Sequence, residues 1–251
     1  MKPVFVHTAN TAKFLAAYSA LERRGAAESC LMVIHGKPGV RKSKTVKWFA
    51  TQNGCPVLTG NIEWKPASFL RALLTELQVT PAYSFERMFQ QALLALAAKA
   101  EKNALEKLPY FVVIDEAEYI SRNLRIMETI RALSDALEIP FLLVGMERIK
   151  QNIQLFEMAE SRAGQYVEFL PESLADTAKL MREVCEVEIA DDLVGFVHKH
   201  AKGLIRETMD AIAVIESHGK RQRGKPVTMV DVEGLTLFNS RKGGAPVVVR
   251  M

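Results

Sequence analysis

The stretch of sequence that decides the fold is LMVIHGKPGVRKS, residues 31–43. Its first four residues are apolar, which predicts a buried strand over 31–34. A glycine-rich turn from Gly36 to Gly39 follows, and residues 42–52 have the character of a helix. A strand, a glycine-rich loop and a helix in this order match the Walker A phosphate-binding pattern G-x-x-x-x-G-K-[ST].

The residue types in this loop suit the binding of a nucleoside triphosphate with magnesium. Successive backbone N–H groups and the helix N-terminus bind phosphate oxygens, a lysine meets the phosphate charge, and the hydroxyl after it ligates Mg²⁺. Lys42 and Ser43 fill the last two roles. ATP and Mg²⁺ are therefore the expected cofactors. The expected nucleotide-contacting residues are Gly36, Lys37, Pro38, Gly39, Val40, Arg41, Lys42, Ser43 and Lys44. The alternative is a glycine turn that binds no nucleotide.

One position departs from the Walker A pattern. Arg41 stands where the second glycine is expected, at a point where the backbone approaches phosphate closely. A non-glycine residue in a left-handed conformation costs about 1–2 kcal/mol. We expect this penalty to weaken or slow nucleotide binding by about tenfold without abolishing it, because arginine attracts phosphate.

A second motif, VVIDE at residues 112–116, is an apolar strand that ends in two carboxylates. In P-loop ATPases the aspartate of such a strand holds the magnesium ion, and an adjacent glutamate orients and deprotonates the attacking water. Asp115 is therefore a candidate magnesium ligand beside Ser43, and Glu116 is the candidate general base. Glu118 is expected to be a solvated neighbour. The alternative is an ordinary strand end whose acids meet solvent.

Apolar runs alternate with helical segments as far as Pro171. Strands are expected over 31–34, 56–59, 110–114, 141–144 and 165–169, and helices over 10–24, 42–52, 66–78, 84–103 and 124–137. This alternation predicts an α/β fold with right-handed crossovers and a parallel sheet. Three further helices are expected over about 173–187, 190–201 and 203–218. The expected domains are a helical leader at 1–27, the α/β core at 28–170, a small helical lid with a basic loop at 171–238, and a tail at 239–251.

The composition is that of an ordinary globular protein with a mild basic bias. The 251 residues carry a formal net charge of +4, which permits contact with nucleic acid without requiring it. No run of about 18 apolar residues occurs, and the N-terminus lacks the features of a secretory signal. Cys30, Cys55 and Cys185 lie far apart and have no metal-binding spacing. We therefore expect a cytoplasmic protein with no membrane partner.

Two arginines are candidates for contact with the terminal phosphate. Arg162, in SRAG at 161–164, lies at a sequence distance that suits an arginine finger, which reaches the nucleotide of a neighbouring subunit. Arg206, in GLIR at 203–206, opens a lid helix and is a candidate sensor of the γ-phosphate. The alternative for each is a surface arginine. Met146 follows the strand at 141–144, near where a polar sensor is expected, and we assign that role to no residue.

The order of HGKPGVRKSKT, FVVIDEAE, LLVGMERI, SRAGQYVEF and KGLIRETMDAI resembles the transposition ATPases of Mu-like phages, the MuB family, and the related TnsC regulators. The likeness extends over about residues 5–215. It implies an AAA+ P-loop ATPase in the bacterial host cytoplasm, which forms a homo-oligomer (ring or helical filament) on double-stranded DNA, selects the insertion target and recruits and activates a DDE transposase. The roles of Lys42, Ser43, Asp115, Glu116, Arg162 and Arg206 carry over, whereas Arg41 and Met146 depart from the family pattern.

A basic loop near the end of the predicted lid is the candidate DNA contact. Its four cations, with no acid between them, are Lys220, Arg221, Arg223 and Lys225. Such a cluster favours phosphate contacts and therefore binding that is sensitive to salt and largely independent of DNA sequence. A solvated loop that keeps the protein soluble is the alternative.

Three functional hypotheses follow from these patterns. The first is an ATP-driven DNA-binding target selector for a transposase. The second is a replication initiator or helicase loader, which shares the ATPase core and the arginine motifs. The third is a nucleotide-gated DNA-binding scaffold that hydrolyses little ATP because of Arg41.

Overall fold

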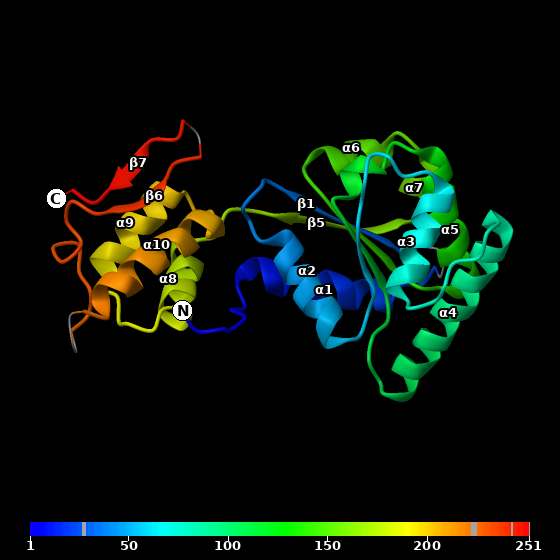
Figure 1. Ribbon diagram of the computed structural model, residues 1–251, viewed down its shortest axis with the longest axis horizontal. Coiled ribbons are helices and arrows are strands. Elements are labelled where there is room, and N and C mark those ends of the chain that lie inside the picture. Colours follow the sequence, from blue (N-terminus) through cyan, green and yellow to red (C-terminus); the bar gives the residue numbers. More distant parts are fainter. Residues whose placement is uncertain (27–28, 222–224, 242, 251) are drawn as a thin grey trace. The chain divides into compact units, whose positions relative to one another are not determined.

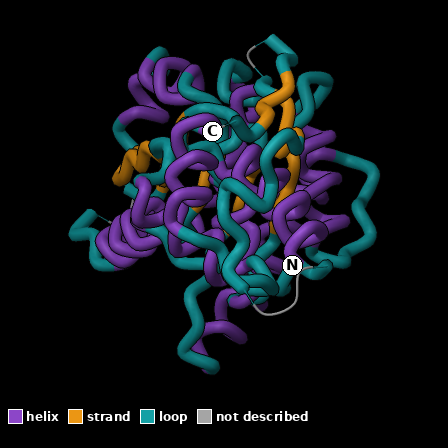
Figure 2. Tube along the Cα trace, turned by 90° about the vertical axis from the view of Figure 1, so that its left-hand side faces the viewer, coloured by secondary structure: helices purple, strands orange, loops and turns teal. Residues whose placement is uncertain are grey.

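The computed structural model describes residues 1–26, 29–221, 225–241 and 243–250. It divides into two compact units. The sheet unit comprises Phe14–Gly36 and Lys42–Phe169, and the helical unit comprises Met1–Lys13, Lys37–Arg41 and Leu170–Met251. In Figure 2 the helices, in purple, make up most of the regular structure, and the strands are orange.

The sheet unit contains a five-stranded parallel sheet. Its strands are β1 (Leu31–Gly36), β2 (Val57–Thr59), β3 (Val112–Asp115), β4 (Phe141–Val144) and β5 (Ala163–Phe169), in the order β2-β3-β4-β1-β5. Every residue of β1, β3 and β4 is buried, as the unbroken apolar runs of these segments predict for strands covered on both faces. The predicted α/β fold with a parallel sheet is confirmed.

Helices lie on both faces of this sheet. They are α1 (Ala9–Glu22), α2 (Lys42–Gln52), α3 (Pro66–Glu76), α4 (Phe85–Leu105), α5 (Leu124–Leu137), α6 (Arg148–Gln154) and α7 (Glu157–Glu160). α1 and α2 lie together on one side, and α3, α4 and α5 lie on the other (Figure 1). This division follows from the strand order. The connection from β1 to β2 runs in one direction across the sheet, and the later connections to β3, β4 and β5 run in the opposite direction. Right-handed crossovers in opposite directions place their helices on opposite faces.

An aromatic cluster fixes α2, the helix that follows the phosphate loop. The Phe49 ring of α2 stacks on Phe111 at a centroid distance of 5.2 Å. Two rings of α1 pack edge-on against Phe49, Phe14 at 5.5 Å and Tyr18 at 5.1 Å. Because Phe111 directly precedes β3, these rings hold α2 in place relative to the strand that carries Asp115.

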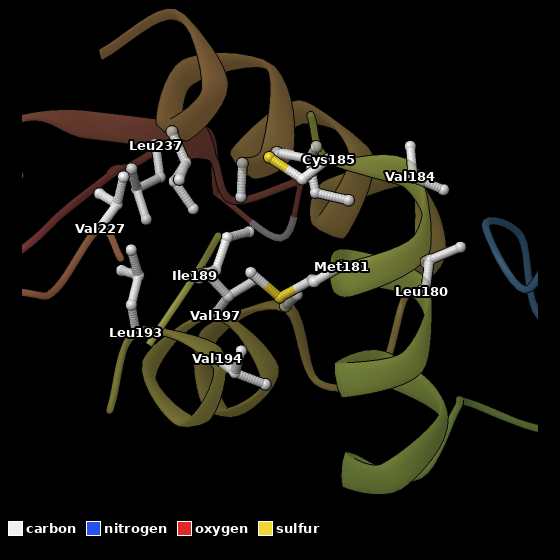
Figure 3. Close-up of a cluster of buried hydrophobic side chains, with 14 of the residues drawn as sticks. Leu180, Met181, Val184, Cys185, Ile189, Leu193, Val194, Val197, Val227 and Leu237 are labelled. Carbon is white, nitrogen blue, oxygen red and sulfur yellow. The ribbon is translucent and has the colours of Figure 1, made fainter. Parts of the chain in front are cut away.

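The helical unit packs three helices against a hairpin. The helices are α8 (Leu174–Val184), α9 (Asp191–Ala201) and α10 (Ile205–Gly219), and the hairpin strands are β6 (Thr236–Asn239) and β7 (Pro246–Val248). Figure 3 shows the core of this unit, where Met181 of α8, Leu193 and Val197 of α9, and Leu237 of β6 meet. This is the small helical region predicted after Pro171.

Two of the expected boundaries need correction. The segment 239–251 was expected to be a tail, but it contains β7, which pairs antiparallel with β6, and Val249 is buried in the core of the helical unit. The segment 1–27 was expected to be one helical leader, but residues 1–13 group with the helical unit, whose core includes Val6. In both places short apolar runs are buried against partners distant in sequence, which local patterns do not reveal.

None of the helices in the described ranges is both long enough and apolar enough to cross a membrane.

Candidate nucleotide-binding site

The phosphate loop begins where β1 ends and finishes where α2 begins. Gly36, the last residue of β1, has a φ of 147°, and a Cβ atom there would lie 2.3 Å from the carbonyl oxygen of Phe169. Only glycine fits at this position, because β5 pairs so closely with β1. Lys42 is the first residue of α2, and its Nζ donates a hydrogen bond of 2.8 Å to the Gly36 carbonyl. The lysine therefore reaches back across the base of the loop.

Lys42 is a buried cation in an acidic neighbourhood. Its exposed fraction is 8%. Burial lowers the pKa of Lys42, and the charges of Glu118, Asp115 and Glu147 oppose that effect. A buried ammonium with several carboxylates nearby suits a nucleotide phosphate that binds together with a metal cation such as Mg²⁺.

Ser43 and Asp115, the two predicted magnesium ligands, lie side by side. Ser43 Oγ donates to Asp115 Oδ1 at 2.8 Å, and the Glu116 N–H donates to the same oxygen at 3.1 Å. The other oxygen of Asp115 forms an ion pair of 2.7 Å with Lys47 Nζ. A hydroxyl and a carboxylate are oxygen donors of the kind that Mg²⁺ prefers, with water and phosphate completing its shell. These residues therefore fit the ion.

Lys47 is a residue of this site that the sequence analysis did not identify. The signal was present, because Lys47 follows Ser43 by four residues and so lies on the same face of α2. Its ammonium neutralises the almost fully buried carboxylate of Asp115. The negative charge of Asp115 is thus neutralised by Lys47 when no metal ion is bound.

The two glutamates after Asp115 differ in their surroundings. Glu116 is exposed and has a left-handed φ of 53°. Glu118 was expected to be solvated, but it is half-buried, and its Oε2 atom is buried with no hydrogen-bond partner among the described residues. A Cβ atom on Gly145 would lie 2.5 Å from that oxygen. The 3₁₀ turn Ala117–Tyr119 folds Glu118 back toward the end of β4, which is why the expectation was wrong.

Arg41 adopts the left-handed conformation that its place in the motif leads us to expect, with a φ of 69°. Its guanidinium lies over the Phe5 ring, 4.9 Å from the centroid. Burial lowers the pKa of Arg41, and the charge of Glu172 opposes that effect. Glu172 is itself buried and accepts hydrogen bonds from Thr8 and Asn10. The side chain of Arg41 is thus held inside the helical unit by a ring and a nearby carboxylate.

Replacing Arg41 separates backbone strain from side-chain contacts. We expect Arg41→Ala to be less stable than Arg41→Gly by about 1 kcal/mol, because both lose the contact with Phe5 but only glycine relaxes the left-handed backbone. Thermal or urea unfolding of the two variants measures the difference. Equal stabilities would show that the backbone at residue 41 is not strained.

The remaining residues of the loop lie at different depths. Val40 is fully buried and Lys44 is exposed on α2. The Gly39 carbonyl accepts a hydrogen bond of 3.1 Å from the N–H of Ile205, the first residue of α10. Residues 37–39 and the exposed Arg206 line one cavity in the helical unit. The structure therefore brings Arg206 next to part of the phosphate loop.

Arg162 lies at the amino ends of β1 and β5, whereas the phosphate loop follows the carboxyl end of β1. It directly precedes β5, and its carbonyl accepts a hydrogen bond from the N–H of Leu31, the first residue of β1. The loop starts at the opposite end of β1, which is about 17 Å away along the strand. Arg162 forms a two-point ion pair with Asp135, with both distances 3.2 Å. The structure thus does not place Arg162 beside Lys42 of its own chain.

The predicted DNA-contacting cations are not equivalent. Lys220 forms ion pairs with Glu186 at 2.9 Å and with Glu216 at 3.0 Å. Arg221 and Lys225 are exposed. Arg223 lies outside the described residues. Lys220 is therefore largely neutralised, and the exposed cations are the better candidates for phosphate contacts.

The sequence profile of a family described as AAA domain matches residues 27–153. No curated protein sequence matches the chain. Among solved structures, the chain is similar to Cdc6p from Pyrobaculum aerophilum, with a TM-score of 0.64 at 14% identity over 92% of this chain and 68% of that one.

Two other solved structures show the same likeness. One is the Orc1 protein of Aeropyrum pernix in complex with DNA, with a TM-score of 0.57 at 14% identity over 90% of this chain and 63% of that one. The other is the RuvB Holliday junction branch migration motor of Thermotoga maritima, with a TM-score of 0.56 at 18% identity over 89% and 66%. The chain spans about two thirds of the length of these proteins, and the likeness establishes a shared fold.

Proposed function

Because the chain belongs to the AAA domain family, we propose that it binds ATP and Mg²⁺ at the loop of residues 36–43 and hydrolyses the nucleotide. The observation that carries this proposal is the hydrogen bond of 2.8 Å between Ser43 Oγ and Asp115 Oδ1, next to the buried Lys42. In P-loop enzymes a hydroxyl after the lysine and an aspartate at the end of a strand are the protein groups that hold the magnesium of the nucleotide.

Each residue of the sheet unit has a separate part in this proposal. Lys42 neutralises phosphate charge, and Ser43 and Asp115 hold the metal ion. Magnesium, when bound, spreads the charge that develops on the phosphate oxygens. Glu116 orients the attacking water and accepts its proton, a role for which an exposed carboxylate next to the metal ligand is suited.

The proposal is tested by calorimetric titration with ATP at millimolar magnesium, together with measurement of phosphate release. We expect binding that depends on magnesium and slow turnover that rises when duplex DNA is added. A titration without heat, at millimolar ATP and magnesium, would overturn the assignment of the loop.

We propose that Arg162 acts on the nucleotide of a neighbouring subunit. Its support is that Arg162 lies at the amino end of β1, about 17 Å along the strand from the phosphate loop of its own chain, so a nucleotide that it contacts must come from a second chain. Specific ATPase activity should then rise with protein concentration, and Arg162→Ala should lower its plateau by about tenfold. Asp135→Asn is the matched variant: it removes the ion pair between Asp135 and Arg162 and should keep the rise. A specific activity that does not vary with concentration contradicts the role.

For the whole protein, we propose an oligomeric, ATP-dependent DNA-binding protein that selects target DNA and recruits a DDE transposase. The order of the motifs supports this role, and the exposed Arg221 and Lys225 are suited to phosphate contacts that do not read sequence. Helicase loading at a replication origin is the competing role. Co-purification of the tagged chain from its host with a transposase supports the proposal, and co-purification with a helicase contradicts it.

A further inference from the structure

Two lysines of α2 act on the Asp115 carboxylate, and they are held in different ways. Lys42 is buried and donates a hydrogen bond to the Gly36 carbonyl, and the charge of Asp115 acts on it. Lys47 lies further along the helix, and its Nζ forms an ion pair of 2.7 Å with Asp115 Oδ2. The Lys47 side chain is 45% exposed, whereas the Asp115 side chain is 7% exposed. Lys47 therefore has room to leave the pair, and Asp115 stays buried when it does.

Packing within the sheet unit fixes the backbone of Lys47 relative to Asp115. Phe49, which follows Lys47 on α2, stacks on Phe111, and Phe111 directly precedes the strand that ends in Asp115. Val46, the residue before Lys47, is fully buried. An ion pair between two mobile surface side chains loses the freedom of both, whereas here only the Lys47 side chain has freedom to lose. The pair is therefore a built feature of the site rather than a chance surface contact.

Both oxygens of the Asp115 carboxylate are engaged. Oδ1 accepts hydrogen bonds from the Ser43 hydroxyl at 2.8 Å and from the Glu116 N–H at 3.1 Å, and Oδ2 pairs with Lys47. A metal ion that binds this carboxylate must lie next to the Lys47 ammonium or displace it. Among the described residues, no group of three or more His, Cys, Asp or Glu side chains is placed to hold a metal ion. Binding of a divalent cation by the protein alone is therefore disfavoured.

We propose that Lys47 competes with magnesium for the Asp115 carboxylate and thereby makes occupancy of the metal site depend on the nucleotide. The inference rests on the proposed binding of ATP and Mg²⁺ at this loop. A triphosphate carries several negative charges, which offset the two lysine ammonium groups, and its oxygens complete the shell of the metal ion. Lys47 then exchanges Asp115 for solvent, and the carboxylate becomes available as a ligand. Lys47 is thus a positioning residue that acts through Asp115.

The first test measures the gain in nucleotide affinity that magnesium provides. Calorimetry gives the affinity for a non-hydrolysable ATP analogue with millimolar magnesium and with EDTA, and the ratio of the two affinities is the deciding quantity. We expect Lys47→Met to raise this ratio about tenfold, because one competing charge-assisted hydrogen bond to the carboxylate is removed. Lys47→Arg keeps a cation that pairs with carboxylates and should leave the ratio within about twofold. Partial unfolding lowers both affinities equally, so an unchanged ratio in Lys47→Met overturns the proposal.

The second test needs no nucleotide. Thermal unfolding is measured in sodium chloride and in magnesium chloride at equal ionic strength, so that screening by salt is the same. Lys47→Met should be less stable than the unmodified protein, because the buried carboxylate of Asp115 loses its counter-charge. Magnesium should restore part of the lost stability in Lys47→Met. It should leave the melting temperature unchanged in the unmodified protein and in Lys99→Met, which removes an exposed lysine of α4.

The two tests separate this proposal from the proposed function. An equal response to magnesium in the unmodified protein and in Lys47→Met contradicts the competition, even where both bind the ATP analogue. If the unmodified protein does not bind the analogue, it is the proposed function that fails, and the thermal comparison still decides whether Lys47 competes with magnesium for Asp115.

Discussion

Replacing Lys42 by alanine is expected to weaken ATP binding by at least about 100-fold, because a buried charge-assisted contact to phosphate is lost. The Lys42 ammonium is buried at the start of α2 and is hydrogen-bonded to Gly36 at 2.8 Å. Without it, the carboxylates of Glu118, Asp115 and Glu147 that act on Lys42 would repel the triphosphate. Calorimetric titration with ATP and magnesium measures the loss.

The matched control for this experiment is Lys99→Ala. Lys99 is exposed on α4, so its removal changes the net charge by the same amount without touching the loop. The ATP affinity of Lys99→Ala should stay within about twofold of the ATP affinity of the unmodified protein, because exposed charges are screened by salt. Equal losses in the two variants would mean that Lys42 acts only through net charge, which contradicts its role as a phosphate ligand.

Glu116→Gln is expected to lower ATP turnover by about a thousandfold while leaving ATP affinity within about threefold, the signature of a lost general base. Glu118→Gln should behave in the opposite way. Glu118 is half-buried and its charge acts on Lys42, so its neutralisation should tighten ATP binding and change turnover little. Single-turnover phosphate release and calorimetry separate the two effects. Loss of turnover in Glu118→Gln, with normal turnover in Glu116→Gln, would transfer the base role to Glu118.

Local patterns predicted most of the sheet unit. The predicted α2, α5 and β4 agree with the structure residue for residue, because a motif, an N-cap at Asn123 and an unbroken apolar run mark their limits. The juxtaposition of Ser43 with Asp115 also follows from the sequence, since the carboxyl ends of parallel strands share one edge. The strand order itself is a long-range property that no local pattern contains.

Features that depend on packing were missed. The hairpin β6–β7 has strands of four and three residues joined through glycines, which locally is indistinguishable from a flexible end. Its strands are stabilised by burial against α10 and its neighbours in the core of the helical unit. The turn that returns Glu118 toward β4 begins with Glu116 in a left-handed conformation. Glutamate rarely adopts this conformation, so the sequence does not predict the turn.

The core of the helical unit joins residues from the two far ends of the numbering, Val6 and Val249. During synthesis, the ribosome releases all of the sheet unit before Val249 exists, so that unit can form its sheet early. The helical unit, by contrast, cannot complete its core until Val249 has been synthesised. Until then the apolar side chains of α8, α9 and α10 stay partly uncovered, so the nascent chain is prone to aggregate between the synthesis of these helices and that of Val249.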